Sequence, residues 1–250
     1  MTFRIIARLD IKPPNLVKGV HLEGLRKIGV PEHFAEQYFL NGIDEINYQD
    51  IVASLYDRNS ISYLVSETAS NVFVPITVGG GVRTLSDANS LIRAGADKIS
   101  INTAAVRNPE ILSELSKSLG QQAIVLNVEA KFFSGLGYMV MIDSGREHTG
   151  KSVSQWLMEA NNFGFGELLL TSVDKEGTMQ GFDQELFELA RKIIDVPILL
   201  HGGFGNIEDI LSAAKSGADG AVIASILHYK KIEIQLIKET LYRNNIEVRM

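Results

Sequence analysis

The feature that most restricts the fold of this chain is an internal repeat with constant spacing. The segment VPITVGGGVRTLSDANSLIRAGADKISINTA, which starts at Val74, aligns without a gap on VPILLHGGFGNIEDILSAAKSGADGAVIASI, which starts at Val196. The same offset carries Glu45 onto Glu167. The chain therefore consists of two copies of one half. The segment Gly120–Gln122 between them is too short to separate two domains.

Short apolar runs alternate with longer amphipathic stretches, which is typical of repeated βα units and a parallel sheet. Eight runs are predicted as strands: Phe3–Leu9, Glu45–Tyr48, Ile76–Val78, Lys98–Ile101, Ala123–Val128, Glu167–Leu170, Ile198–Leu200 and Gly220–Ala224. The helices are expected at Pro31–Asn41, Ile61–Asn71, Leu85–Ala94, Pro109–Ser118, Val153–Phe163, Gln184–Ile194, Ile207–Ser216 and Glu233–Arg243.

An open doubly wound sheet is the alternative arrangement of eight parallel strands, but the half repeat favours closure around a pseudo-twofold axis. The sequence predicts an α/β fold of the (β/α)8 TIM barrel type with an internal half-barrel duplication. A length of 250 residues fits one such domain, residues 1–250. Two stretches that follow strands are irregular: Ile11–Ile28 is expected to be a loop, and Phe132–Gly150 a small hairpin.

Composition excludes several classes of function. The chain has no Cys, which rules out disulfides, iron–sulfur clusters and thiol catalysis. Its net charge of −6 disfavours nucleic acid or an anionic membrane as a partner, because both require dense Lys and Arg. Charges interrupt the N-terminal MTFRIIARLD, so no signal peptide and no membrane span are expected. We expect a cytoplasmic protein.

Two glycine pairs follow the third and seventh strands, and each is matched by a small or polar pair after the next strand. We name Gly80, Gly81, Asn102 and Thr103 the first cradle, and Gly202, Gly203, Ala224 and Ser225 the second cradle. Glycine lets the backbone approach a ligand, and exposed N–H groups attract phosphate. The repetition favours two phosphate sites over glycines that only form turns.

Two carboxylates occupy equivalent places in the two halves. Asp10 ends the first strand in RLDIK, and Glu129 ends the fifth in LNVEAK. An acid at the carboxyl end of a barrel strand points into the mouth, where it can transfer a proton. The structural alternative is that each acid forms a salt bridge with Lys12 or Lys131, two residues along.

Further candidates lie in two other segments after strands. Lys18 in the first loop is a candidate cation for the ligand, or a solvated lysine. The segment TSVDKEGT follows the sixth strand and holds the candidate ligand-binding residues Thr171, Asp174, Glu176 and Gly177. Its acids could bind hydroxyl groups, or Asp174 and Gly177 could shape a turn.

At the opposite end of the barrel, four charged residues lie near the starts of strands: Arg4, Glu45, Lys98 and Glu167. Two positive and two negative charges can neutralise one another as a ring, which is either a plug or a gate. No metal site is predicted, because His201 has no second ligand at a suitable spacing. No motif indicates a cofactor. Trp156 is expected to be core packing.

With these residues in view, the chain resembles the cyclase subunit of imidazole glycerol phosphate synthase over essentially its full length. The motifs that match are RLDIK, LVKG, VGGGVRTL, GADKISINTAAV, GELLLTSVDKEGT, HGGFG and IASILH. The resemblance implies a (β/α)8 barrel in which ammonia from a glutaminase partner passes up the barrel. There the ammonia reacts with a bisphosphorylated aminoimidazole precursor.

The resemblance also implies roles for individual residues. Asp10 matches the first general acid/base, Lys18 the loop lysine, and Asp97 a residue that faces the glutaminase. The phosphate binders match Gly81, Asn102, Thr103, Gly202, Gly203, Ala224 and Ser225. The ammonia gate matches Arg4, Glu45, Lys98 and Glu167, which we call the gate residues.

The departures from the family cluster at the substrate end. Glu129 stands in place of the second catalytic Asp, and Arg8, Pro13–Pro14, Glu176 and His201 replace other family residues there. Because the gate residues match the family whereas these residues differ from it, the pattern favours a changed ligand. Two alternatives therefore stay open: a paralogue that serves amidation of a sugar for surface polysaccharide, and the related phosphosugar isomerase, which needs no partner.

Overall fold

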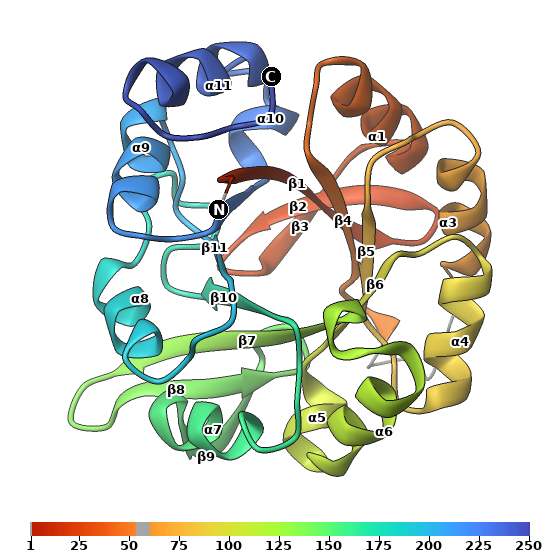
Figure 1. The fold of residues 1–250 in the computed structure, drawn as a ribbon, viewed down its shortest axis with the longest axis vertical. Helices are drawn as coiled ribbons and strands as arrows, with labels where there is room; N and C mark the ends of the chain where they lie inside the picture. The colour runs from red at the N-terminus through yellow and green to blue at the C-terminus, as the bar shows by residue number, and fades with distance from the viewer. Residues whose placement is uncertain (1, 54–60) are drawn as a thin grey trace.

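The computed structural model describes residues 2–53 and 61–250. At its centre is a closed barrel of parallel strands, with helices around it (Figure 1). The barrel strands, in order, are β1 (Arg4–Lys12), β4 (Glu45–Asp50), β5 (Ile76–Gly79), β6 (Lys98–Ile101), β7 (Ile124–Phe133), β10 (Glu167–Ser172), β11 (Ile198–His201) and β12 (Gly220–Ile223). Because β1 pairs with both β4 and β12, the sheet closes on itself. The (β/α)8 prediction is confirmed.

The outer helices lie where the amphipathic stretches predict them. They are α1 (Pro31–Leu40), α3 (Ser62–Ala69), α4 (Leu85–Arg93), α6 (Glu110–Leu119), α7 (Val153–Ala160), α8 (Gln184–Arg191), α9 (Ile207–Lys215) and α11 (Ile234–Arg243). Three short helices were not expected: α5 (Thr103–Arg107), η1 (Gln121–Ala123) and α10 (Ser225–His228). Within the described ranges, no helix is both long and apolar enough to span a membrane.

The half repeat of the sequence is also a repeat of local structure. Helix α4 begins with a capping box of Thr84 and Asp87, and α9 begins with the equivalent box of Asn206 and Asp209. Each box satisfies backbone N–H groups that the first helical turn leaves free. Helices α5 and α10 follow β6 and β12 at matching positions. Equivalent residues thus form equivalent structure in both halves.

Two excursions extend from the carboxyl ends of the barrel strands. The expectation of a loop over Ile11–Ile28 is wrong, because β1 continues into an antiparallel hairpin of β2 (Asn15–Val20) and β3 (Glu23–Gly29). The predicted hairpin after the fifth strand is present. There β7 continues to Phe133 and pairs with β8 (Gly137–Ile142), which pairs with β9 (Glu147–Ser152).

Apolar side chains pack on both faces of the barrel wall. The outward face of the strands packs against the helices in the main core, where Trp156 is fully buried as predicted. A separate cluster fills the barrel interior: Ile6, Val125, Leu169, Leu199 and Val222. These residues alternate with outward-facing ones along each strand, as the pleat of a barrel requires.

Candidate active site at the mouth of the barrel

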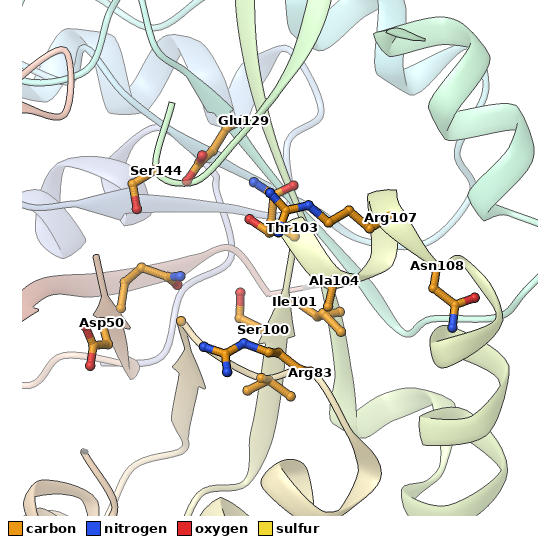
Figure 2. Close-up of a pocket in the computed structure, with 15 residues that line it drawn as sticks. Asp50, Arg83, Ser100, Ile101, Thr103, Ala104, Arg107, Asn108, Glu129 and Ser144 are labelled. Atoms are coloured by element: carbon orange, nitrogen blue, oxygen red, sulfur yellow. The ribbon is translucent and has the colours of Figure 1, made fainter. Parts of the chain in front are cut away.

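A cavity of about 350 Å³ opens at the carboxyl ends of β4 to β7 (Figure 2). This volume suits a small ligand. Its wall includes the whole first cradle, and Glu129 lies at its edge. Further polar side chains that the sequence did not single out also line it: Gln49, Asp50, Arg83, Ser100, Arg107, Asn108 and Ser144. The structure therefore brings the first cradle and one of the two predicted acids to a single cavity.

Asp10 lies buried in a cluster of opposite charges. Arg8 Nε donates to its Oδ1 at 2.8 Å, and Lys18 Nζ lies 3.6 Å from its Oδ2. Burial raises the pKa of Asp10, but Arg8, Lys18 and His201 outweigh it and hold this pKa well below the ordinary range of a carboxyl. Asp10 is therefore ionised at neutral pH. Its ion pairs are with Arg8 and Lys18, so the alternative of a salt bridge with Lys12 is wrong.

Glu129 has a different electrostatic environment. Its side chain is buried and accepts a hydrogen bond from Gly145 N at 2.8 Å. Burial raises its pKa to about 7, although the charge of Arg8 and the Gly145 bond oppose the rise. The structural alternative for Glu129 was a salt bridge with Lys131. The Nζ of Lys131 instead lies over the Phe133 ring, 5.9 Å from the ring centroid. A carboxyl that is part ionised near neutral pH can both accept and donate a proton.

The turn between β8 and β9 covers this side of the mouth. Asp143, Ser144 and Gly145 all have positive φ angles, of 51°, 59° and 76°. Backbone of this kind is costly for non-glycine residues and gathers at functional sites. Thr103 Oγ1 accepts from Asp143 N at 3.1 Å, and Asn102 Nδ2 donates to Met141 O at 3.1 Å. The first cradle is thus fastened to the turn that holds Glu129.

The second cradle is nearly filled. Its cavity measures about 20 Å³, enough for about one water molecule. Gly181 N donates to Gly203 O at 2.8 Å, and Lys18, Glu176 and Met179 also line the space. A phosphate at this cradle would require the segment around Met179 to move. The prediction of two phosphate sites stays a prediction, with space for a ligand at the first cradle.

The sixth-strand segment is tied to the β2–β3 hairpin. Glu176 is fully buried, forms an ion pair with Lys18 and accepts from Leu22 N at 2.9 Å. Lys18 is therefore not a solvated lysine. Asp174 accepts from Phe132 N at 2.7 Å, so this acid shapes the backbone here rather than facing the cavity. Gly177 lines the second cradle, and Thr171 is buried inside the barrel.

The gate residues form one ion-pair network at the other end of the barrel. Arg4 Nη1 lies 3.2 Å from Glu45 Oε2 and 2.8 Å from Glu167 Oε1. Lys98 Nζ lies 2.9 Å from Glu45 and 3.0 Å from Glu167. Each cation contacts both anions, so the four side chains form the ring that their charges predict.

Asp97 accepts a hydrogen bond from Ile76 N at 2.8 Å, and its repeat equivalent Asp219 accepts from Ile198 N at 2.8 Å. This shared bond gives Asp97 a structural role. Its contact with a glutaminase stays a prediction. Across residues 2–53 and 61–250, no three His, Asp or Glu side chains gather as metal ligands.

Sequence reasoning did not predict the contacts of Arg8 and Gly145. For Arg8 a signal exists, because residues 8 and 10 of one strand point to the same side. The contact of Gly145 with Glu129 spans a turn whose conformation no motif specifies. It could not have been found from the sequence.

Comparisons with known proteins agree with one another. Residues 4–233 match the family model described as histidine biosynthesis protein. A relative from Legionella pneumophila named imidazole glycerol phosphate synthase subunit HisF is 52% identical over 206 residues, which are 82% of this chain and 97% of the relative. Relatives with the same name from Helicobacter hepaticus and Beutenbergia cavernae are 44% and 41% identical, over 99% and 100% of this chain and 98% and 99% of their own.

Proposed function

Because the chain belongs to the family of histidine biosynthesis proteins, we propose that it is the cyclase subunit of an imidazole glycerol phosphate synthase. In this role it combines ammonia with a bisphosphorylated aminoimidazole precursor at the mouth of the barrel. The observation that carries the proposal is the cavity whose wall includes Glu129 and the whole first cradle. Such a cavity can hold a phosphorylated ligand against a proton-transferring group.

The two acids differ in what they can do. Glu129, with its pKa near 7, can accept a proton from attacking ammonia and return it to a leaving group. Asp10 is held as an anion by Arg8 and Lys18, so it can stabilise positive charge that develops on the substrate. We assign the proton transfer to Glu129 and the electrostatic role to Asp10.

The phosphates are assigned to the two cradles. At the first cradle, the cavity also presents Arg83 and Arg107, and guanidinium groups suit phosphate recognition. At the second cradle, ligand binding would displace the segment around Met179 and change the surroundings of Lys18 and Glu176. The substrate would thus enter with one phosphate in the open cavity before the second cradle is formed.

The name of the relatives describes a subunit, which implies a partner. We assign a glutaminase to the face where the barrel strands begin, because the gate residues lie there. Two large apolar side chains are exposed on segments that lead into strands at this face: Leu40, at the end of α1, and Phe73, just before β5. The ring of Phe73 packs against Phe39, with centroids 5.8 Å apart. Exposed apolar groups of this kind suit a protein interface.

The alternatives are less well supported. The relatives reported above are all named as the synthase subunit, and none is named as an isomerase or a sugar-amidating enzyme. An isomerase would also leave the gate ring without a use. We therefore interpret the departures from the family at the mouth, such as Glu129 and His201, as variations within the family reaction and not as signs of another substrate.

The test is an assay of the purified barrel with the bisphosphorylated aminoimidazole precursor and ammonium chloride at mildly alkaline pH. Formation of imidazole glycerol phosphate that depends on ammonium concentration is expected. Isomerisation of a phosphosugar without any ammonium requirement would support the isomerase instead. Failure to convert the precursor under any condition would overturn the proposal.

A further inference from the structure

The turn between β8 and β9 has a counterpart in the other half of the barrel. The half repeat aligns Asp143 and Ser144 with His21 and Leu22, which form the turn between β2 and β3. All four residues have positive φ angles: 51° and 59° in the first turn, 54° and 62° in the second. The two hairpins therefore end in the same backbone conformation, and the repeat allows one turn to be compared with the other.

Each turn donates an N–H to a buried glutamate beside one of the cradles. Gly145 N donates to Glu129 at 2.8 Å beside the first cradle, and Leu22 N donates to Glu176 at 2.9 Å beside the second. Beside the second cradle the cavity is nearly filled, whereas beside the first it is open. The turn between β8 and β9 thus positions Glu129 next to a space that a ligand can enter.

Arg107 holds this turn from the side of the first cradle. It ends helix α5, one helical turn after Thr103, and a helical side chain points back towards the N-terminus, so Arg107 reaches over Thr103 (Figure 2). Its Nη2 lies 2.9 Å from Asp143 Oδ2 and 3.4 Å from Glu147 Oε2. The repeat aligns Arg107 with Tyr229, so this cation belongs to the first cradle alone.

Asp143 is held at three points. Its carboxylate pairs with Arg107, its N–H donates to Thr103 Oγ1 at 3.1 Å, and its carbonyl accepts from Arg146 Nη1 at 3.1 Å. Left-handed backbone is unfavourable for Asp and persists only where the surroundings hold it. Two of the three contacts are with Thr103 and Arg107, which line the cavity. The conformation of the turn therefore depends on side chains that a ligand can contact.

A phosphate in this cavity competes with Asp143 for both of these side chains. The wall presents Gly80 and Gly81 together with Thr103 and Arg107. A phosphate has more acceptor oxygens and more charge than a carboxylate, and a guanidinium group can bind it through two parallel hydrogen bonds. Arg107 is also accessible to such a ligand, because 57% of its side chain is exposed.

We propose that Arg107 is a positioning residue shared between the substrate phosphate and Asp143, so that phosphate binding at the first cradle loosens the turn that donates the Gly145 N–H to Glu129. This inference rests on the proposed function for the identity of the ligand. It adds a coupling between phosphate binding and the group that transfers protons. The resemblance to the family assigns no role to Arg107 or Asp143.

The direction of the effect on Glu129 follows from its surroundings. Glu129 faces Arg8 and Asp10 from β1, and Arg146 and the Gly145 N–H from the turn. Both groups of the turn lower the pKa of Glu129, so loosening the turn raises it. Glu129 therefore binds a proton more tightly once the phosphate is seated, when ammonia has a substrate to attack. By linkage, the protein with Glu129 protonated binds phosphate more tightly.

The test uses inorganic sulfate as the probe, because sulfate has the shape and charge of a phosphate dianion but does not titrate near neutral pH. The titration of Glu129 is followed by carbon NMR of labelled glutamate carboxyl groups, and Glu129→Gln assigns the signal. In the wild type, saturating sulfate should raise the midpoint by about one pH unit, a tenfold change in proton affinity.

Arg107→Gln and Asp143→Asn each remove one side of the ion pair. In both variants the midpoint of Glu129 should be raised before sulfate is added, and sulfate should shift it less than half as far as in the wild type. Glu147→Gln is the matched control, because it removes a charge beside Arg107 from β9 and leaves the turn intact. Its midpoint without sulfate should equal that of the wild type. An equal shift with sulfate in the wild type and both pair variants would overturn the inference.

The affinity for sulfate, measured by calorimetry, separates a shared residue from a merely structural one. Arg107→Gln should weaken sulfate binding about tenfold, because a charge-assisted contact is lost. Asp143→Asn should tighten it, because Arg107 no longer has that competing partner. An ion pair that only supports the turn would change the affinity in the same direction in both variants. That result, or no sulfate binding to the wild type, would overturn the inference.

These measurements need no turnover, so the two proposals fail separately. If the barrel converts no precursor with ammonium chloride, the proposed function fails, and the sulfate measurements still decide whether Arg107 couples an anion at the first cradle to Glu129. If the precursor is converted but sulfate does not shift the titration of Glu129, the coupling alone is wrong.

Discussion

Arg8 and Asp10 form an ion pair inside the barrel, with Arg8 Nε 2.8 Å from Asp10 Oδ1 and both side chains almost completely buried. Both residues lie on β1, two positions apart, so the alternation of the strand brings them together. In this pair the pKa of Asp10 is held well below its ordinary range, so its carboxylate is ionised at neutral pH. This is why we propose Glu129, and not Asp10, as the group that transfers protons.

Replacing Asp10 by Asn should destabilise the protein through the uncompensated cation. Removing one partner of a buried ion pair costs about 3–5 kcal/mol, whereas replacing both by neutral groups costs much less. We expect Asp10→Asn to lower the free energy of urea unfolding by an amount in this range, and Arg8→Met with Asp10→Asn to recover most of it. Neither variant should be active. Equal stability of the single and double variants would show that the pair is not coupled.

Glu129 should make stability depend on pH. Its pKa rises from an ordinary 4.5 to about 7 on folding, so the folded protein binds more protons than the unfolded chain within that window. The free energy of unfolding should therefore fall by about 3 kcal/mol as pH rises from 4.5 to beyond 7. Glu129→Gln removes this loss. Urea unfolding across the window should show the variant gaining stability relative to the wild type, and parallel curves would contradict the assignment.

Gly145 should be required for the position of Glu129. In Gly145→Ala the new methyl group would lie 3.0 Å from Leu22 Cδ1 at a φ of +76°, which displaces the N–H that Glu129 accepts. We expect turnover to fall about tenfold or more. The hydrogen bond from Gly145 lowers the pKa of Glu129, so its loss should raise that pKa and move the acid limb of the pH–rate profile to higher pH.

The matched control is Gly150→Ala. Gly150 has a nearly equal φ of +77°, but a methyl group there meets nothing within 4 Å. Backbone strain is thus alike in the two variants, and only Gly145→Ala disturbs the site. Similar kinetic effects in both variants would mean that strain, rather than the bond to Glu129, explains the result.

The gate ring should matter for ammonia from the partner more than for ammonia in solution. Lys98→Met removes the cation that contacts both Glu45 and Glu167. We expect less product per glutamate with glutamine as the source, and little change with ammonium chloride. Arg243→Ala is the control: its pair with Glu239 is exposed and contributes no more than about 1 kcal/mol. An unchanged ratio of product to glutamate in Lys98→Met would show that the ring takes no part in the passage of ammonia.

The fold could be predicted because the half repeat and the strand periodicity are properties of the chain itself. Pairs such as Asp97 and Asp219 bind equivalent backbone groups in the two halves. The gate ring could be predicted for the same reason, since Glu45 and Glu167 are repeat equivalents at strand starts. Such positions depend on local pattern, which a single sequence contains.

The contacts between excursions could not be predicted in this way. Lys18 pairs with Glu176 across 158 positions of the chain, from a hairpin whose second strand, EGLRKIG, has no regular alternation of apolar residues. The filling of the second cradle follows from that packing. Glycine spacing therefore located both cradles, but only the structure distinguishes the open one from the filled one.

The central claim is that Glu129 transfers protons in the conversion of the bisphosphorylated aminoimidazole precursor to imidazole glycerol phosphate. The most direct measurement is the ammonium-driven turnover of Glu129→Gln relative to the wild type, at saturating precursor and at a pH above 7. A glutamine side chain keeps the size and accepts the Gly145 N–H but cannot take a proton. The account predicts a loss of about 10²–10⁴-fold. Turnover of Glu129→Gln equal to that of the wild type would contradict it.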